Sequence, residues 1–260
     1  MSVPRSSPAE PAATQANSAP GGAWAGTTVA TVVRPDRDCP LCPRLVAFRE
    51  AQRGAHPEWF NAPVPSFGDE AAKILIVGLA PGLRGANRTG RPFTGDYAGT
   101  LLYSTLRKFA LAQGNYAARP DDGLALLGVR ITNAVRCVPP QNKPEPHEIA
   151  GCRRFLEAEI AALPGLRAFV ALGAIAHDAV LAALGLRRAP FRFAHGAVHL
   201  LADGRLLADS YHCSRLNTNT GRLSAAMFEA VFAALVDRLG AGSAGGIAMR
   251  DAHSSSAVPR

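Results

Sequence analysis

The chain has 260 residues, of which 48% are hydrophobic and 18% charged, so it can build one large domain or two small ones around an ordinary core. We expect no membrane partner and no export, because no run approaches the roughly 18 apolar residues of a membrane span and the first residues lack a basic-then-apolar signal. The net charge of +8 is compatible with a polyanionic partner. Arginine-rich composition from genomic base bias would give the same charge, so charge alone does not identify nucleic acid as the partner.

Both ends of the chain have a different composition from its middle. Residues 1–30 are dominated by Ala, Pro, Ser, Gly and Thr, and residues 241–260 have a similar composition. Segments this poor in large apolar side chains cannot offset the entropy cost of ordering, so both are predicted to be disordered tails. The predicted folded body is a single domain over residues 31–240, with no internal repeat and no long linker.

Short apolar runs alternate with helical patterns along this body. Such alternation predicts an α/β fold, in which a central, mainly parallel four-stranded sheet is flanked by helices in three layers. The carboxyl ends of parallel strands share one edge, where ligands bind, so the unusual segments that follow these strands should meet there. The predicted strands are 73–78, 129–133, 166–171 and 206–210, and the predicted helices are 101–112, 145–162 (with Pro146 in its first turn), 174–184 and 221–239.

Five cysteines, an odd number in a chain without an export signal, argue against a disulfide framework. Cys39 and Cys42 form a C-x2-C pair, and Cys137 and Cys152 follow much later. Four thiolates satisfy either a tetrahedral zinc ion or an iron–sulfur cubane, and the spacing does not separate these two readings. The alternative is four unrelated buried thiols. Cys213 lies beside His212 in a loop predicted to face DNA, and we assign it to neither cluster nor catalysis.

The segment after the first strand reads GLAPGLRGANRTGRPFTGDYAG and has six glycines over residues 78–99. It lacks the endings of a P-loop and of a dinucleotide-binding turn, so binding of triphosphates or dinucleotides loses support. Its other side chains suit a planar base: Phe93 offers a stacking surface, Asp96 a carboxylate, and Asn87 and Arg88 hydrogen bonds. The alternative makes Phe93 a core residue and Asp96 a helix N-cap, and the glycine density favours the binding loop.

The segment after the fourth strand reads YHCSRLNTNTGRL, residues 211–223. His212 is a candidate donor to charge that develops on a leaving group, and Ser214 and Asn217 have short side chains suited to phosphate. Arg215 and Leu216 are suited to the space left by an extruded nucleotide. A structural histidine and helix-capping hydroxyls are the alternatives. A Ser–His–Asp hydrolase triad is a poor reading because the G-x-S-x-G turn is missing.

These two segments, the four spaced cysteines and NAVRCVPPQNKP at residues 133–144 together resemble the bacterial and archaeal iron–sulfur uracil-DNA glycosylases, and most closely their fifth family. The similarity runs from about Cys39 to Leu223. It implies the uracil-DNA glycosylase-like fold and a [4Fe–4S] cluster on Cys39, Cys42, Cys137 and Cys152. The implied catalytic groups are Asp96, Asn142 and His212, the implied base-binding residues are Gly78, Ala80, Asn87, Phe93 and Asn133, and the implied DNA-binding residues are Arg88, Ser214, Arg215, Leu216 and Asn217.

Three positions depart from the family pattern. Gly82 stands where an aspartate or asparagine often follows GLAP, Cys213 where proline is frequent, and Asn133 where this branch often has alanine. The first departure shifts the catalytic assignment to Asp96 and Asn142. The second makes intercalation of this loop into DNA less firmly implied than the loop itself, and the third should alter discrimination among bases.

The resemblance implies a monofunctional glycosylase that excises uracil, hypoxanthine and xanthine from double- and single-stranded DNA. No lysine is evidently placed for a Schiff base, so strand cleavage is not expected. The protein should act as a monomer in the cytoplasm, associated with the nucleoid. Two other classes remain open: a non-catalytic DNA-binding metalloprotein, and a nucleotide or phosphoester hydrolase that uses His212 and Asp96 as acid and base.

Overall fold

A computed structural model describes residues 33–241. The predicted tails, 1–30 and 241–260, lie outside this range except for Ala241, the last residue of α7. No helix in the described range is long and apolar enough to cross a bilayer.

A six-stranded sheet in the order β1-β5-β2-β6-β8-β7 forms the centre of the fold. Its four inner strands are parallel: Ile76 of β2 pairs with Ile131 of β5 on one side and with Val170 of β6 on the other. Both outer strands run antiparallel to their neighbours. The bounds are β1 Phe67–Gly68, β2 Ile74–Gly78, β5 Val129–Asn133, β6 Ala168–Leu172, β7 Val198–Leu200 and β8 Leu206–Ser210, with a separate hairpin of β3 Ala112–Gln113 and β4 Ala125–Leu126.

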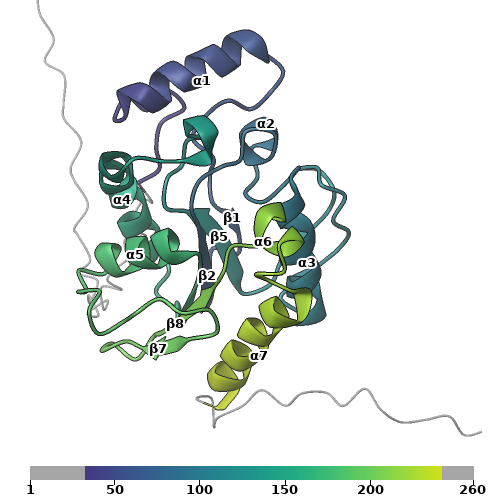
Figure 1. Cartoon of the computed structure of the whole chain (residues 1–260), viewed down its shortest axis with the longest axis vertical. Helices are drawn as coiled ribbons and strands as arrows, with labels where there is room; N and C mark the ends of the chain where they lie inside the picture. Colours follow the sequence, from purple (N-terminus) through teal and green to yellow (C-terminus); the bar gives the residue numbers. More distant parts are fainter. Residues whose placement is uncertain (1–32, 242–260) are drawn as a thin grey trace, which may run out of the picture. The chain divides into compact units, whose positions relative to one another are not determined.

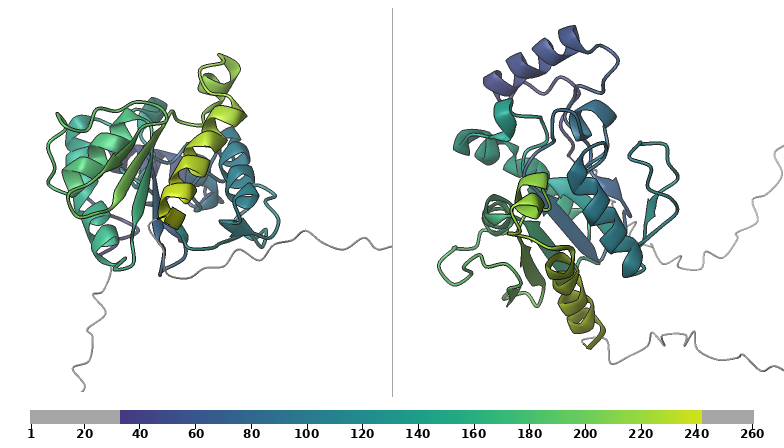
Figure 2. Two further views of the ribbon diagram at one scale, coloured as in Figure 1. Left: turned by 90° about the horizontal axis from the view of Figure 1, so that it is seen from below. Right: turned by 45° about the vertical axis from the view of Figure 1, so that its right-hand side comes forward.

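Helices cover both faces of this sheet, with α4 and α5 on one face and α3 and α7 on the other (Figures 1 and 2). One core cluster fills each interface, because successive strand residues point to opposite faces: Ile76 packs toward α3 and α7, and Leu75 toward α4 and α5. The helices are α1 Pro43–Ala55, α2 Ala86–Thr89, α3 Tyr97–Lys108, α4 Pro146–Ala161, α5 Ala174–Ala183, α6 Arg215–Asn219 and α7 Ala225–Ala241, with a 3-10 turn at Pro140–Asn142.

The predicted fold class is confirmed, and the sheet is two strands wider than the four that the sequence predicts. The four predicted strands and four predicted helices are all present, with ends shifted by several residues. The largest shifts are of four residues: α3 begins and ends four residues earlier than predicted, and α7 begins at Ala225 instead of residue 221, after Ser224, whose Oγ accepts from Met227 N (3.1 Å). The edge strands have only two or three residues, too few to show a period of two.

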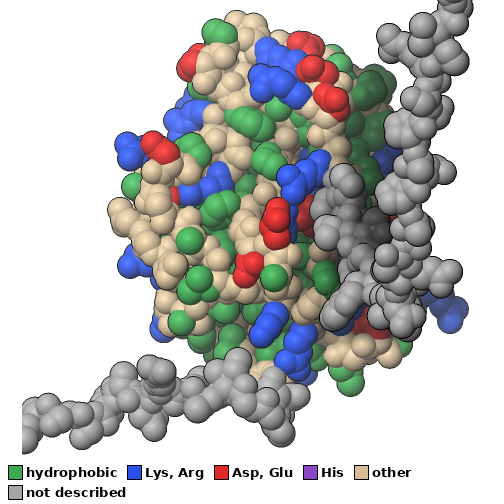
Figure 3. Space-filling view, turned by 180° about the vertical axis from the view of Figure 1, so that it is seen from behind, with side chains coloured by type: hydrophobic (Ala, Val, Ile, Leu, Met, Phe, Trp, Pro, Cys, Tyr) green, Lys and Arg blue, Asp and Glu red, His purple; other side chains and the backbone are tan. Residues whose placement is uncertain are grey.

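Basic side chains are dispersed over the face opposite to that of Figure 1. Where the grey residues leave this face open, Lys and Arg occur singly or in small groups among acidic and apolar side chains (Figure 3). The net charge of +8 is therefore not concentrated in one patch there. The candidate residues for a nucleic-acid partner lie instead at the carboxyl edge of the sheet.

Candidate active site

Phe93 lies directly against the end of the first two inner strands. A Cβ added to Gly78 would lie 2.7 Å from Phe93 Cζ and 2.4 Å from Asn133 Oδ1, so only glycine permits this approach. Phe93 has φ of +52°, rare for a bulky residue and costing about 1–3 kcal/mol, and the Tyr116 hydroxyl donates to its carbonyl (3.2 Å). Phe93 is only 6% exposed and packs in the core. It is therefore a core residue and also a side chain of the candidate site.

Asn133 closes the same corner with an unused amide. It is 3% exposed, and its Oδ1 has no hydrogen-bond partner within the described residues. An unpaired buried acceptor costs about 1–3 kcal/mol, so such an atom marks a place where a ligand or a water would bind. The sequence flagged Asn133 only through its departure from the family pattern; the unpaired oxygen is visible only in the structure.

Asp96 is the N-cap of α3 and is also packed against the glycine loop. Its carboxylate accepts from Gly99 N (3.4 Å), and an added Cβ on Gly85 would lie 2.3 Å from its Oδ2. A Cβ added to Gly82 would lie 3.0 Å from the same Oδ2 atom. Burial raises the pKa of Asp96 above its ordinary 3.8, against the lowering effect of hydrogen bonds from the backbone. Asp96 therefore caps α3 and is at the same time buried against the glycine loop.

His212 brings the second segment to Phe93. Their ring centroids are 5.8 Å apart and the planes differ by 29°. Burial among its neighbours lowers the pKa of His212 to about 4, so the ring is neutral at physiological pH and one of its nitrogens carries a proton to donate. Gly173, at the end of β6, adjoins it: a Cβ there would be 3.9 Å from His212 Cβ.

Cys213, to which the sequence assigns no role, is a core residue. It is fully buried in the core cluster between the sheet and α3 and α7. Burial raises the pKa of its thiol, with Asp96 as the second cause, which places Asp96 near this segment. Adjacent residues of an extended segment point to opposite sides, so burying Cys213 anchors the chain beside His212.

The short helix α6 carries the residues predicted to bind DNA. Ser214 caps it by accepting from Asn217 N (3.5 Å), and Asn217 Nδ2 donates to the carbonyl of His212 (2.8 Å). Leu216 is 72% exposed, and the Arg215 guanidinium lies 5.4 Å from the ring centroid of Tyr97. Asn217 therefore positions the His212 backbone, and Arg215 and Leu216 are exposed at the start of α6.

The remaining predicted site residues differ in burial and in hydrogen bonding. Asn87 is 1% exposed, and its Nδ2 donates to Asn61 Oδ1 (2.9 Å), so its amide nitrogen is already engaged. Arg88 is exposed and donates to the Gly95 carbonyl (3.4 Å), and Ala80 is half-buried. Asn142 is exposed with φ of +57°. Their roles toward substrate stay predictions.

A buried ion pair that the sequence did not reveal holds the Phe93 loop in place. Arg91 donates through two nitrogens to the two oxygens of Asp122, both at 2.8 Å, and its Nε donates to Thr94 (2.7 Å). The Arg91 side chain is 5% exposed and that of Asp122 is inaccessible. The guanidinium holds the pKa of Asp122 well below its ordinary 3.8.

We expect Asp122→Asn to lower the free energy of unfolding by about 3–5 kcal/mol, because it leaves a buried guanidinium without its counter-charge. The control Asp121→Asn should cost under about 1 kcal/mol, since Asp121 is 75% exposed in its pair with Arg119. Because the folded-state pKa lies below the unfolded value, the wild-type advantage should be full at neutral pH, begin to decline as pH falls below 3.8, and be lost only as pH passes through the lower folded-state pKa. Urea unfolding measures both; equal costs for the two variants would contradict this account.

A second site, built by cysteines, lies beyond the carboxyl end of β5. Cys39 and Cys42 precede α1, Cys137 follows β5, and Cys152 is on α4, and all four line one apolar cavity with Leu45, Val135 and Phe155. Burial raises the pKa of Cys137 to about 12 and that of Cys152 to about 11. Four thiols from three separate segments thus face one another in a dry space, which is the donor set of a thiolate-ligated metal centre.

Two details describe the size and charge of this cavity. Among the described residues, no three of the cysteine sulfurs lie within 4.8 Å of one another. Two buried arginines line the cavity: Arg49 donates to Cys137 Sγ (3.8 Å), and the backbone N–H of Arg136 donates to Cys152 Sγ (3.3 Å). The Arg136 guanidinium itself donates to Ser66 and Glu159, so Arg49 is the cationic side chain that donates to a cysteine here.

The fold combines three α/β layers, a corner of Phe93, Asn133 and His212 at the carboxyl edge of the sheet, and four cysteines around one cavity. The family model described as the Uracil DNA glycosylase superfamily matches residues 65–236. The chain belongs to this superfamily.

Among the curated relatives, the type-5 enzymes are more similar to this chain than the type-4 enzyme is. A type-5 uracil-DNA glycosylase of Thermus thermophilus is 52% identical over 196 residues, which cover 73% of this chain and 89% of that protein. The type-5 enzyme of Pyrobaculum aerophilum is 43% identical over 72% of this chain and 83% of its own length. A type-4 enzyme of the same organism is 34% identical over 58% of this chain and 63% of its own length. The predicted resemblance to the fifth family is confirmed.

Proposed function

We propose that this protein is a monofunctional DNA glycosylase that hydrolyses the N-glycosidic bond of uracil, and of the deaminated bases hypoxanthine and xanthine, in DNA. The single observation that carries the proposal is the corner where the neutral His212 ring lies 5.8 Å from the Phe93 ring, beside the unpaired Asn133 oxygen. The type-5 names of the relatives supply the reaction. The substrate range beyond uracil rests on the family resemblance and on Asn133.

The base has to leave the helix before it can reach this corner. Unstacking costs a few kcal/mol, and contacts in the pocket offset it. The projecting Leu216, with Arg215 beside it, is suited to fill the gap in the duplex. Phe93 then stacks on the extruded base, and the unpaired Oδ1 of Asn133 accepts from its edge, with Nδ2 as the neighbouring donor. Because an amide offers both a donor and an acceptor, Asn133 suits bases with either pattern.

Hydrolysis breaks the C1′–N bond, adds water oxygen to C1′ and leaves the base with the bonding electron pair. Asp96, as a carboxylate, offsets the positive charge that develops on the sugar and orients the water. His212, neutral because its pKa is about 4, donates a hydrogen bond to the base oxygen that becomes negative. Asn142 is the further polar group that we assign to the site, at the water or the sugar.

We expect a single acid limb in the pH dependence of excision. Asp96 acts as a carboxylate, and burial raises its pKa, so the rate should rise with pH through a midpoint above 3.8. His212 should add no limb near neutral pH, because it ionises at about 4. Single-turnover rates on a deoxyuridine duplex from pH 4 to 9 measure this. A second inflection near pH 6.5 that disappears in His212→Gln would show that His212 acts as a cation instead.

The four cysteines are proposed to hold a [4Fe–4S] cluster. Zinc–sulfur bonds of about 2.3 Å would bring tetrahedral ligand sulfurs to about 3.8 Å from one another, which the wider spacing here does not match. Arg49, which donates to Cys137 Sγ (3.8 Å), would supply positive charge beside an anionic cluster. When bound, the cluster would supply a covalent crosslink and not electrons, since hydrolysis transfers none. The cysteines then tie α1, the segment after β5, and α4 together.

One gel assay separates the proposal from its two rivals. The protein is incubated with a duplex that has one deoxyuridine, with matched single-stranded DNA, and with free nucleotides, and samples are run with and without alkali. We expect a break at the deoxyuridine only after alkali, and no turnover of nucleotides. Binding without a break would favour a DNA-binding metalloprotein, and turnover of free nucleotides a phosphoester hydrolase. We propose that the domain of residues 31–240 works as a monomer in the cytoplasm.

A further inference from the structure

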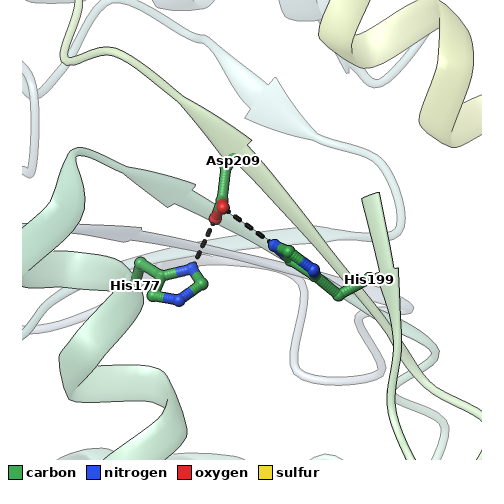
Figure 4. A group of neighbouring side chains, drawn as sticks. All are labelled: His177, His199 and Asp209. Atoms are coloured by element: carbon green, nitrogen blue, oxygen red, sulfur yellow. Dashed lines mark hydrogen bonds and ion pairs between the residues drawn. The ribbon is translucent and has the colours of Figure 1, made fainter. Parts of the chain in front are cut away.

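A second cluster of ligating side chains lies on the α5 side of the sheet. His177 of α5, His199 of β7 and Asp209 of β8 come together from three elements (Figure 4). His177 Nδ1 is 2.7 Å from Asp209 Oδ1, and His199 Nε2 is 3.1 Å from Asp209 Oδ2, which also accepts from Ala194 N (3.4 Å). The side chains of His177 and Asp209 are 1% and 0% exposed, and that of His199 is 16% exposed.

The hydrogen-bond partners of His177 require a proton or a metal ion between its Nδ1 and Asp209. Its Nε2 lies 2.8 Å from the carbonyl oxygen of Phe191, and a carbonyl only accepts, so Nε2 carries a proton. In a neutral ring, Nδ1 then has a lone pair, and this lone pair points at a carboxylate oxygen 2.7 Å away. Two acceptors at that distance repel unless a proton or a metal ion lies between them. The bridging species is therefore either a proton, carried by His177 or by Asp209, or a bound metal ion.

The third member favours the metal. The ligand atoms of the three residues all lie within 4.8 Å of one another. Two imidazoles and one carboxylate are a ligand set of zinc, whose bonds of about 2.0–2.2 Å separate neighbouring ligand atoms by about 3.3 Å. The two histidine–carboxylate contacts, at 2.7 and 3.1 Å, would have to widen toward that separation to admit the ion. A metal-bound histidine usually donates its other N–H to a carbonyl, as His177 does to Phe191.

We propose that His177, His199 and Asp209 bind one divalent transition-metal ion, zinc by ligand type, at a site separate from the four cysteines. Apolar rings surround it: the Phe193 centroid is 5.8 Å from that of His177, and the Phe191 centroid is 5.9 Å from that of His199. The ion joins α5, β7 and β8 at Asp209, three residues before His212. Its role is to fix the start of the segment that brings His212 to the base.

The test counts zinc in the full chain. Wild-type protein, His199→Gln and the control His56→Gln are each given two equivalents of zinc chloride, dialysed against citrate, and assayed for zinc and iron by mass spectrometry. His56 is an exposed histidine stacked on Trp59 at 3.8 Å. We expect wild type and His56→Gln to retain one zinc more per chain than His199→Gln, with equal iron in all three. The difference isolates this site whatever the cysteines hold.

Equal zinc in wild type and His199→Gln, or no zinc in wild type, would overturn the proposal and leave a proton as the bridging species. A measurement on wild type alone guards against a variant that does not fold. The zinc X-ray absorption spectrum should fit nitrogen and oxygen ligands at about 2.0–2.2 Å. Sulfur ligands at about 2.3 Å would place the zinc at the cysteines and would equally overturn the site.

Discussion

Asp96→Asn is expected to slow uracil excision by about 100- to 10,000-fold with no loss of stability. The carboxylate is needed to offset charge on the sugar and to orient water, and an amide does neither. Asparagine caps helices as well as aspartate does, so α3 keeps its N-cap. Because burial raises the pKa of Asp96, its ionised form is disfavoured in the fold at neutral pH. The melting temperature should therefore be unchanged or slightly higher.

Asp96→Ala separates the two roles. It removes the carboxylate and the cap together, so it should be as slow as Asp96→Asn and also less stable by about 1 kcal/mol. Single-turnover kinetics and thermal unfolding of the same preparations give both quantities. An Asp96→Asn protein with near wild-type rate would remove Asp96 from the reaction and leave it as the cap of α3 alone.

Cys39→Ser is expected to abolish the iron and the folded yield together. Thiolate-ligated structural metals contribute about 10–16 kcal/mol in small zinc domains, while whole domains are stable by only about 5–15 kcal/mol. Losing one of four ligands would free the segment before α1 from the segment after β5 and from Cys152 of α4. Iron per chain, the visible absorption band and the soluble yield measure the effect.

Cys213→Ala is the matched control, because Cys213 is buried in the core and does not line the cysteine cavity. This variant should keep its colour and its iron. A Cys39→Ser protein that is colourless but fully folded and active would show that the cysteine centre is dispensable. Loss of iron in Cys213→Ala would instead mean that the wrong four cysteines have been assigned.

The longer apolar runs and helical patterns could be predicted from the sequence. The four apolar runs form β2, β5, β6 and β8. Because parallel strands share a carboxyl edge, the sequence also predicted that Phe93 and His212 lie close together. The edge strands β1 and β7 were not predictable, because pairing to a neighbour defines them. Helix α1 could not be predicted because Arg49 interrupts its apolar face. An arginine in that position indicates a solvent-exposed side chain, whereas Arg49 is buried.

At the site, sequence showed which side chains are available and could not show how they are engaged. Asn87 was predicted to bind substrate, and its nitrogen pairs with Asn61, a contact between residues 26 apart in sequence. The sequence assigns no role to Cys213, and the structure buries it in the core. The positive φ of Phe93, the Arg91–Asp122 pair and the His177–His199–Asp209 cluster leave no local pattern, since each depends on contacts between separate segments.

The most direct test of the central claim is the amount of free base released from a duplex with one deoxyuridine per molecule. Purified protein and duplex are incubated, the DNA is precipitated, and uracil in the supernatant is quantified by mass spectrometry. We expect one uracil per duplex, with both strands intact before alkali treatment, and none from the matched thymidine duplex. Release of nucleotide instead of base, or no release from deoxyuridine, hypoxanthine or xanthine duplexes, would contradict the proposal.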